Sequence, residues 1–164
     1  MVKPGKFDEL KCILSCFQYS LHLIILTETW LKSDDEANHY QIPGYTHYYN
    51  YRSTSRGGGV SIYVHNKLKH RLIEEQCTAD CHYLWIHLEN YNLDIGAIYR
   101  KPDTTNLKEF LDIYSQQLYK RGRAVVFGDF NLNLLNMESV TTYREILPGA
   151  GYKIMNNVSE KFCT

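Results

Sequence analysis

The stretch Val125-Val126-Phe127-Gly128-Asp129-Phe130-Asn131 decides how the rest of this chain is interpreted. Its first three residues are apolar and two of them are β-branched, which is typical of a short buried strand. Gly128 then allows the backbone to turn sharply. If extended backbone continues past this glycine, Asp129 and Asn131 point to the same side and could hold a phosphate, a water molecule or a metal ion. The alternative is a simple Asx-type turn that closes the strand.

Two further apolar runs end in the same way. The run His22 to Glu28 ends in a carboxylate, and the run Leu93 to Arg100 ends in a phenol and a guanidinium. Parallel neighbouring strands bring such residues to one rim of a sheet, where α/β proteins commonly bind their ligands. We therefore expect one site, built from Glu28, Tyr99, Asp129 and Asn131.

Composition and charge indicate an ordinary globular domain. A length of 164 residues, with 44% apolar and 22% charged residues, suits one domain with a real core. The 18 basic and 18 acidic residues cancel, so the chain is not a strongly basic nucleic-acid binder, although a local patch would serve a transient contact. The chain has no apolar stretch of the ~20 residues that span a membrane, and no signal peptide. We expect an intracellular protein, nuclear if functional, with no membrane and no obligate protein partner.

The five cysteines are an odd number, and without a secretory signal they favour reduced thiols. Two of them, Cys12 and Cys16, are expected as small core residues of a helix. A zinc site is the alternative for one cluster, formed by Cys77, Cys81, His82 and His87. Its spacing is loose and no second cysteine pair follows, which argues against zinc.

The pattern of apolar residues predicts alternating helices and strands. Helices are predicted over residues 6–19, 106–122 and 139–147, and strands over 22–27, 41–51, 60–65, 82–89, 93–99 and 124–127, with a further strand beginning at 152–158. A tight turn at Tyr91-Asn92 is expected to make a hairpin of two of these strands. The helix over 106–122 has the length of a parallel crossover, which is why Tyr99 and Asp129 are expected on one rim.

Two segments have both a functional and a structural interpretation. The tyrosines between Gln41 and Tyr51 could stack on bases, but a half-buried edge strand is favoured. The segment Arg56-Gly57-Gly58-Gly59 could cradle a phosphate. It lacks the Lys-Ser/Thr ending of a P-loop and no helix follows, so a flexible turn entering a strand is favoured.

Four motifs, taken in order, resemble the endonuclease-exonuclease-phosphatase superfamily. They are Thr27-Glu28-Thr29-Trp30-Leu31, Arg56-Gly57-Gly58-Gly59-Val60-Ser61-Ile62-Tyr63, Ile98-Tyr99-Arg100-Lys101-Pro102 and Phe127-Gly128-Asp129-Phe130-Asn131. The most similar branch is the endonuclease domain of non-LTR (LINE- and jockey-type) retrotransposons, and the resemblance runs from about Phe7 to Thr164. It implies an incomplete four-layer α/β sandwich of two mixed sheets, deoxyribonuclease-like, with residues 1–164 forming a single partial domain.

The resemblance also implies hydrolysis of a phosphodiester with Mg²⁺ (or Mn²⁺), here the nicking of a target-site DNA duplex. Carried over to this chain, Glu28 is the metal ligand, and Asp129 orients or deprotonates the attacking water. Asn131 holds the phosphate and the Asp129 carboxylate, while Tyr99 hydrogen-bonds near the scissile phosphate. Two arginines within the same motifs are expected to bind the substrate, Arg56 and Arg100.

The chain also departs from the family pattern at both ends. The family begins with a strand whose terminal Asn helps to bind the metal, and it ends with an Asp-bearing segment and a Ser-Asp-His strand. The sequence starts after the first and stops before the others. We therefore expect a fragment with exposed apolar sheet edges and with weak activity or none. The alternatives are a non-catalytic remnant or binding module, and a phosphatase acting on other phosphoesters such as inositol lipids.

Overall fold

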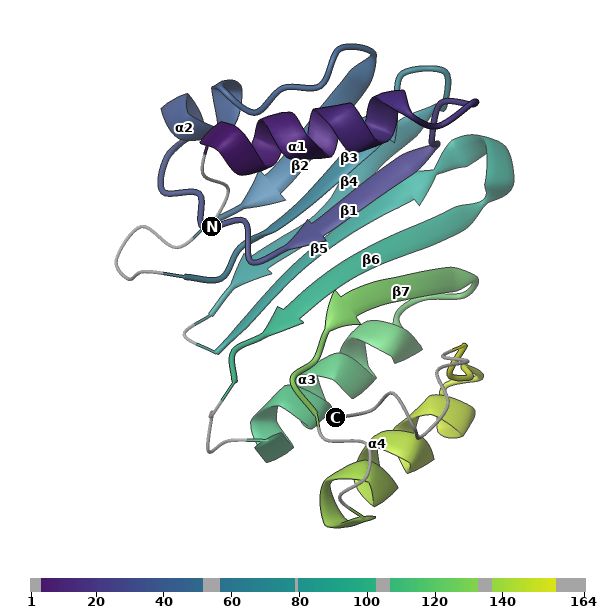
Figure 1. The fold of residues 1–164 in the computed structure, drawn as a ribbon. Helices are drawn as coiled ribbons and strands as arrows, with labels where there is room; N and C mark the ends of the chain where they lie inside the picture. Colours follow the sequence, from purple (N-terminus) through teal and green to yellow (C-terminus); the bar gives the residue numbers. More distant parts are fainter. Residues whose placement is uncertain (1–3, 52–56, 79, 103–106, 133–136, 156–164) are drawn as a thin grey trace. The chain divides into compact units, whose positions relative to one another are not determined.

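A computed structural model describes residues 4–51, 57–78, 80–102, 107–132 and 137–155 (Figure 1). The chain divides into two compact units. The first contains residues 1–105 together with 121–131, and the second contains residues 106–120 and 132–164. Arg56, an expected substrate-binding residue, lies outside the described residues. So does Asn106, the expected start of a helix.

The first unit is built on two sheets. Strands β1 (Leu23–Thr27), β3 (Val60–His65) and β2 (Tyr45–Asn50) form one sheet in that order, and both pairings are antiparallel. Strands β4 (His70–Cys77), β5 (Cys81–Leu88), β6 (Leu93–Arg100) and β7 (Ala124–Asp129) form the other. Its β6–β7 pairing is parallel and the other two are antiparallel, so this sheet is mixed. The helices of this unit are α1 (Pro4–Ser15), α2 (Asp34–Asn38) and the 3₁₀ turn η1 (Glu89–Tyr91).

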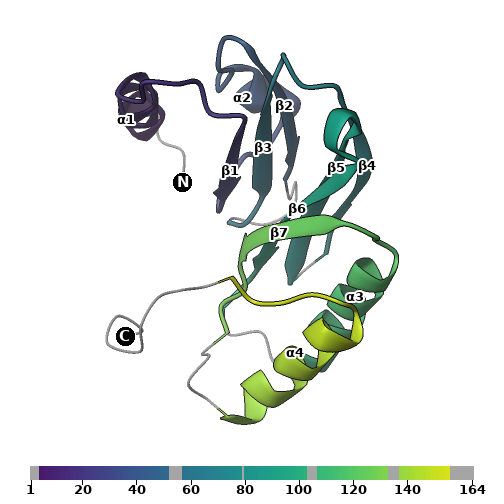
Figure 2. The same cartoon turned by 90° about the vertical axis from the view of Figure 1, so that its right-hand side faces the viewer.

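The main hydrophobic core lies between the two sheets (Figure 2). It is made by the buried side chains Val60, Ile62, Val64, Leu84, Ile86, Leu88, Ile95, Ala97 and Tyr99. Figure 2 shows α1 on the opposite face of the three-stranded sheet, where a second cluster contains Phe7, Ile24, Leu31, Ala37, Tyr40, Ile42 and Tyr63. Central strands β3 and β5 are buried on both faces, which explains their almost continuous apolar sequence. The chain is therefore an α/β protein of two packed sheets, as expected.

A buried amide at the end of β2 ties the sheets together. Asn50 is 7% exposed, and its Nδ2 donates to the carbonyl oxygens of Tyr83 at 2.9 Å and Gln76 at 3.2 Å, both in the other sheet. Its Oδ1 accepts the N–H of Val60 at 3.2 Å. Both donor hydrogens and the acceptor are thus bonded inside the protein, which makes the burial of this polar group tolerable.

The second unit contains α3 (Leu107–Tyr119) and α4 (Met137–Gly149). The two helices pack through the stacked rings of Tyr114 and Tyr143, whose centroids are 5.9 Å apart. Both helices were predicted, to within a few residues. The predicted strand at 152–158 is wrong for its described part, since residues 152–155 form no strand. In the described residues no helix is long and apolar enough to cross a bilayer.

The N-terminal helix is shorter than predicted. It ends at Ser15, where Ser15 Oγ and Cys16 Sγ both donate to the carbonyl of Cys12, at 2.7 and 3.3 Å. Side chains that bond the last turn in this way compete with continuation of the helix. Phe17, which falls within the predicted helix but after its observed end, is 51% exposed. The expected burial of Cys12 and Cys16 is also wrong, because both are exposed.

Strand β4 was not predicted from the sequence. It is an edge strand with little burial and carries the charged residues Arg71, Glu74 and Glu75. An irregularity in the pairing between Leu72 and Glu74 also breaks its alternation of apolar and polar residues. A period-two pattern is therefore lost, although the strand pairs with β5 along its length. The opposite edge strand, β7, exposes Val125 and Phe127.

Candidate active site

The parallel pairing of β6 and β7 places Tyr99 directly beside Asp129. This confirms the crossover inferred from the helical segment between these strands. Gly128, however, lies inside β7 and opposite Ile98, so it does not make the sharp turn that was predicted. A Cβ at this position would overlap the carbonyl oxygen of Ile98. The glycine is required because the two backbones approach closely here.

Glu28 reaches the same place from the other sheet. The Tyr99 hydroxyl donates a hydrogen bond of 2.6 Å to Glu28 Oε1, a length typical of a hydroxyl bonded to a carboxylate. We expected Glu28 at the end of a parallel neighbouring strand, and this was wrong, because β1 belongs to the three-stranded sheet. The residues meet across the space between the sheets, so the three distant segments do converge at one end of the sandwich.

Glu28 sits in a strained turn. Its φ is 54° and that of Trp30 is 59°, a left-handed conformation that non-glycine residues seldom adopt. The turn is held by two backbone hydrogen bonds: Trp30 N–H donates to the Gly58 carbonyl at 2.9 Å, and Thr29 N–H to the Gly59 carbonyl at 3.4 Å. Strain of this kind persists only where the surroundings enforce it, and it is often found at functional sites.

The triple glycine is the turn into β3 that the sequence favoured. Gly57, Gly58 and Gly59 have φ values of 100°, 79° and 86°, which other residues rarely adopt. The Gly59 N–H donates to Nδ1 of His82 at 3.1 Å. This donor is therefore used inside the protein, which weakens the alternative in which the glycines cradle a phosphate.

Beyond Asp129 the chain forms the Asx-type turn that the sequence left open. Strand β7 ends at Asp129, and Asn131 is left-handed with a φ of 45°. The backbone N–H of Asn131 donates to Asp129 Oδ1 at 3.2 Å, and its side-chain Nδ2 donates to the Arg100 carbonyl at 2.6 Å. The expected link between Asn131 and the Asp129 carboxylate is thus made by the backbone. The turn lies at the rim, so the two interpretations of this stretch are compatible.

Arg100 is 5% exposed and supports the same turn. Its Nη1 donates to the carbonyl oxygens of Asn131 at 3.0 Å and Phe130 at 3.4 Å. Since Asn131 bonds back to the Arg100 carbonyl, the two residues clamp each other. These contacts give Arg100 a supporting role, and direct contact with a substrate stays a prediction.

The donor set suits magnesium better than zinc. Within the described residues there is no group of three or more His, Cys, Asp or Glu side chains that could hold a metal ion. Mg²⁺ does not need such a cage, because one or two carboxylates, waters and the phosphates of a substrate complete its octahedron. The half-buried carboxylates of Glu28 and Asp129, at one end of the sandwich, fit this description.

The zinc alternative is supported by one contact, with 3.5 Å between Cys77 Sγ and His82 Nδ1, but its other members do not join them in a metal site within the described residues. Burial raises the pKa of the Cys81 thiol to about 12, which disfavours the thiolate that binds zinc. His87 is bonded to Asp94 instead, with 2.6 Å between Nδ1 and Oδ1. The four described cysteines are free thiols.

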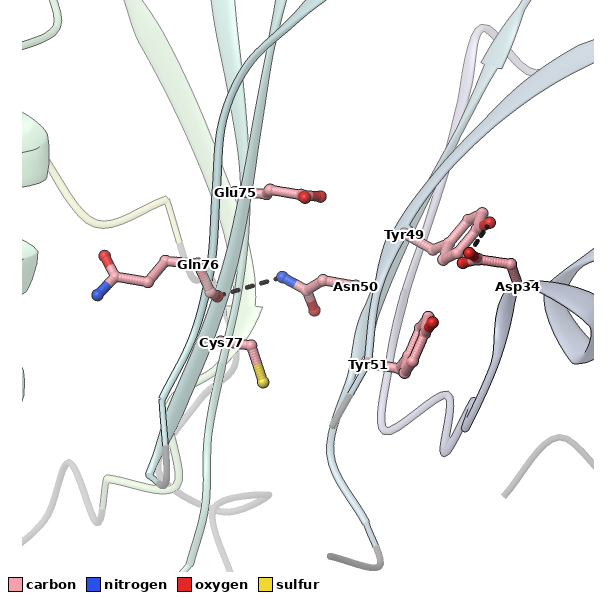
Figure 3. Close-up of a pocket in the computed structure, with 7 residues that line it drawn as sticks. All are labelled: Asp34, Tyr49, Asn50, Tyr51, Glu75, Gln76 and Cys77. Carbon is pink, nitrogen blue, oxygen red and sulfur yellow. Dashed lines mark hydrogen bonds between the residues drawn. The ribbon is translucent and has the colours of Figure 1, made fainter. Parts of the chain in front are cut away.

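A pocket of about 420 Å³ opens between the edge strands β2 and β4 (Figure 3). It is lined by Asp34, Tyr49, Asn50, Tyr51, Glu75, Gln76 and Cys77. The Tyr49 hydroxyl donates to Asp34 Oδ1 at 3.1 Å, and Figure 3 shows Glu75 on the β4 side. Two carboxylates repel a phosphate, so this pocket is not the place for a phosphodiester. Strand β2 is a half-buried edge strand, as favoured over a base-stacking surface.

Sequence reasoning missed the importance of His82, which it treated only as a possible zinc ligand. The residue is fully buried and lies opposite Tyr99 in the β5–β6 pairing, and the two rings make a T-shaped contact with 6.0 Å between their centroids. One signal could have found it. The hairpin turn at Tyr91-Asn92 fixes the register of the two strands, and that register pairs position 82 with position 99.

Residues 13–145 match the model of the Endonuclease/Exonuclease/phosphatase family. The chain belongs to this family. No curated protein sequence matches it. Its fold is similar to that of mannosyl-6-phosphatase Bt3783 from Bacteroides thetaiotaomicron VPI-5482, with a TM-score of 0.61, 11% identity, and coverage of 87% of this chain and 62% of that one.

Two further structures share the fold. D. rerio TDP2 complexed with a single strand DNA product has a TM-score of 0.56 and 12% identity, covering 82% of this chain and 57% of that one. The human Nocturnin catalytic domain with a bound sulfate anion has a TM-score of 0.52 and 11% identity, covering 87% and 62%. At these identities the similarity concerns the fold alone. The chain spans about three fifths of the length of these structures.

Proposed function

We propose that this chain is part of a metal-dependent phosphodiesterase domain that nicks DNA, of the kind found in non-LTR retrotransposons. The observation that carries the proposal is the 2.6 Å contact of the Tyr99 hydroxyl with the Glu28 carboxylate, next to Asp129. An acid from each of two sheets, with a phenol between them, is a suitable frame for a divalent ion and a phosphate. The retrotransposon assignment rests on the motif resemblance.

Each residue has a distinct role in this proposal. Glu28 would hold Mg²⁺ or Mn²⁺ through its carboxylate, and its orientation is set by the Tyr99 hydroxyl. The bound ion supplies neutralisation of the charge that develops on the phosphate oxygens. Asp129 would accept a proton from the attacking water, with one oxygen already fixed by the N–H of Asn131. Arg100 and Asn131 would keep this carboxylate in place by holding the turn that follows β7.

A nucleic acid is the substrate class to test first. Proteins of this family are in general metal-dependent, and one solved structure of the same fold, that of D. rerio TDP2, carries a single strand DNA product. The second candidate is a remnant or binding module that keeps the fold without the chemistry. It is favoured by the way Asn131 uses its side-chain amide on a backbone carbonyl.

The test is the nicking of supercoiled plasmid by the purified chain in Mg²⁺. Glu28→Gln and Asp129→Asn remove one charge each and keep the shape of the side chain, and Asp112→Asn makes the same change at an exposed position on α3. We expect weak nicking that is lost in both site variants and retained in the Asp112 variant. Nicking that survives in Glu28→Gln contradicts the assigned roles. No nicking at any protein concentration favours the non-catalytic remnant.

A further inference from the structure

His82 is a fully buried polar residue at the start of β5, at the end of the sheets where Glu28 and Tyr99 meet. Its imidazole makes a T-shaped contact with the phenol ring of Tyr99, with an angle of 72° between the ring planes. A buried polar ring costs free energy unless its nitrogens are bonded. The reason for a histidine here therefore lies in the contacts that its ring makes.

The first contact is with the backbone of the glycine turn. Nδ1 of His82 lies 3.1 Å from the Gly59 nitrogen and accepts its N–H, so the neutral ring carries its proton on Nε2. The ring also touches the preceding residue, since a Cβ on Gly58 would lie only 2.8 Å from Nε2. The imidazole thus sets where these two glycines can lie.

The opposite side of the same two glycines carries the turn that presents the acid. Their carbonyl oxygens accept the N–H groups of Trp30 and Thr29, and a Cβ on Gly59 would lie 2.6 Å from Thr29 Oγ1. The glycine pair is therefore held between the imidazole and the left-handed turn at Glu28. Because glycine is conformationally free, its position depends on these neighbours.

We infer that His82 is a positioning residue, which holds the Glu28 carboxylate ready for a divalent ion through Gly59 and Thr29. The contacts form a closed circuit from His82 to Gly59, Thr29, Glu28 and Tyr99, and back to the His82 ring. The inference rests on the proposed function, in which Glu28 binds the ion. It assigns to His82 no contact with the ion or the substrate.

Loss of the Nδ1 acceptor of His82 should disturb the turn at Glu28 and leave the pairing of the strands intact. Without Nδ1, the Gly59 N–H is buried and unbonded, and the glycine pair can move. The strained φ values of Glu28 and Trp30 then lose the support that maintains them. The expected result is a misplaced carboxylate in a chain whose two sheets still pair. Partners that orient a metal ligand typically contribute 10- to 100-fold to metal affinity.

The test compares variants that have or lack a hydrogen-bond acceptor at the position of His82 Nδ1. His82→Leu keeps much of the volume and removes the acceptor, while His82→Asn places an amide oxygen close to the position of Nδ1. His87→Leu is the matched control, because His87 lies on the same strand and its Nδ1 is bonded to Asp94. If His82→Leu does not fold, His82→Gln replaces it, since its amide reaches the position of Nε2 and not that of Nδ1.

Two measurements are made on the full chain. The first is Mn²⁺ affinity by electron paramagnetic resonance, which we expect to fall about tenfold or more in His82→Leu. His82→Asn should restore most of it, and His87→Leu should leave it unchanged. The second is amide hydrogen exchange without metal, read by NMR. We expect faster exchange at Thr29 and Trp30 in His82→Leu, with the amides of the β6–β7 pairing unaffected.

The outcomes separate this inference from the proposed function. An unchanged Mn²⁺ affinity in His82→Leu overturns the inference, and so does an equal loss in His82→Asn or His87→Leu. Failure of the unmutated chain to bind Mn²⁺ counts against the proposed function. Amide exchange then decides the inference alone: selective acceleration at Thr29 and Trp30 supports it, and unchanged exchange overturns it.

Discussion

The two sheets supply the residues of the proposed site in different ways. The four-stranded sheet places Tyr99 beside Asp129 by regular parallel pairing. The three-stranded sheet presents Glu28 on a left-handed turn, held by backbone hydrogen bonds to glycines that follow much later in the chain. Regular pairing needs only two strands in register, whereas a strained turn needs support from elsewhere. The four-stranded half of the site should therefore depend on close backbone packing, and the three-stranded half on long-range polar contacts.

The largest loss of stability is expected from Gly128→Ala, which disturbs the parallel pairing of β6 and β7. The added methyl overlaps the carbonyl of Ile98, and the strain should reduce the free energy of unfolding by about 3 kcal/mol. Urea unfolding followed by circular dichroism measures the loss. Gly122→Ala is the control, because a Cβ there meets no atom within 4 Å. Equal stability of the two variants would show that the close approach of β6 and β7 is unimportant.

The three-stranded sheet should instead respond to acid. His47 on β2 is stacked on Tyr63 at 4.1 Å, and burial lowers its pKa from 6.5 to about 4. At pH values between about 4 and 6.5, His47 is protonated in the unfolded chain and neutral in the folded chain. This contribution to stability is complete above pH 6.5 and is lost as pH falls toward 4, by up to about 1.4 kcal/mol per pH unit.

The change is measured by urea unfolding at several pH values between 7 and 4. His47→Phe keeps a ring for stacking and removes the titration, so its stability should fall less steeply with acid than that of the unmutated chain. Identical slopes would mean that other groups carry the acid sensitivity of this sheet.

A smaller effect is expected where the two sheets meet. Tyr99→Phe removes the hydroxyl that donates to Glu28, which should destabilise the fold by about 1.5 kcal/mol. Tyr91→Phe is the control, since Tyr91 is 52% exposed. Combining Tyr99→Phe with Glu28→Gln in a double-mutant cycle should give a coupling energy of about 1 kcal/mol. A coupling of zero would mean that the contact contributes nothing to holding the site.

The smallest effect is expected at the turn after β7. Asn131→Ala removes the hydrogen bond to the Arg100 carbonyl and puts alanine at a φ of 45°, with an expected loss of about 1 kcal/mol. Asn131→Gly removes the same bond but tolerates that φ, so it should lose less stability. Thermal unfolding of the two variants separates the bond from the backbone strain. If Asn131→Ala lost as much stability as Gly128→Ala, the turn after β7 would matter as much to the fold as the β6–β7 pairing.

The sequence predicts the regular half of the site and not the strained half. Apolar runs, a tight turn and a crossover helix are local signals, and they place Tyr99 and Asp129 together. Glu28 follows β1, which belongs to the other sheet, and its approach to Tyr99 depends on how the two sheets pack. No local sequence pattern predicts that packing. Strand β4 was missed because the irregularity between Leu72 and Glu74 breaks its alternation, and Gly128 was taken for a turn because its close approach to Ile98 is a contact between strands. Asn50 and His82 form hydrogen bonds to residues far away in the sequence, so no local pattern predicts their contacts.

The amide of Asn50 has a consequence for how the site receives a ligand. Glu28 and Asp129 belong to different sheets, so any breathing motion between the layers would change the gap between the two acids. Asn50 bonds the backbone of the opposite layer from the end of β2. Sliding or opening there must first break these bonds. Under the proposed function, an ion at Glu28 and a water at Asp129 would thus meet acids whose separation is already set, and little binding energy would be consumed in drawing the layers together.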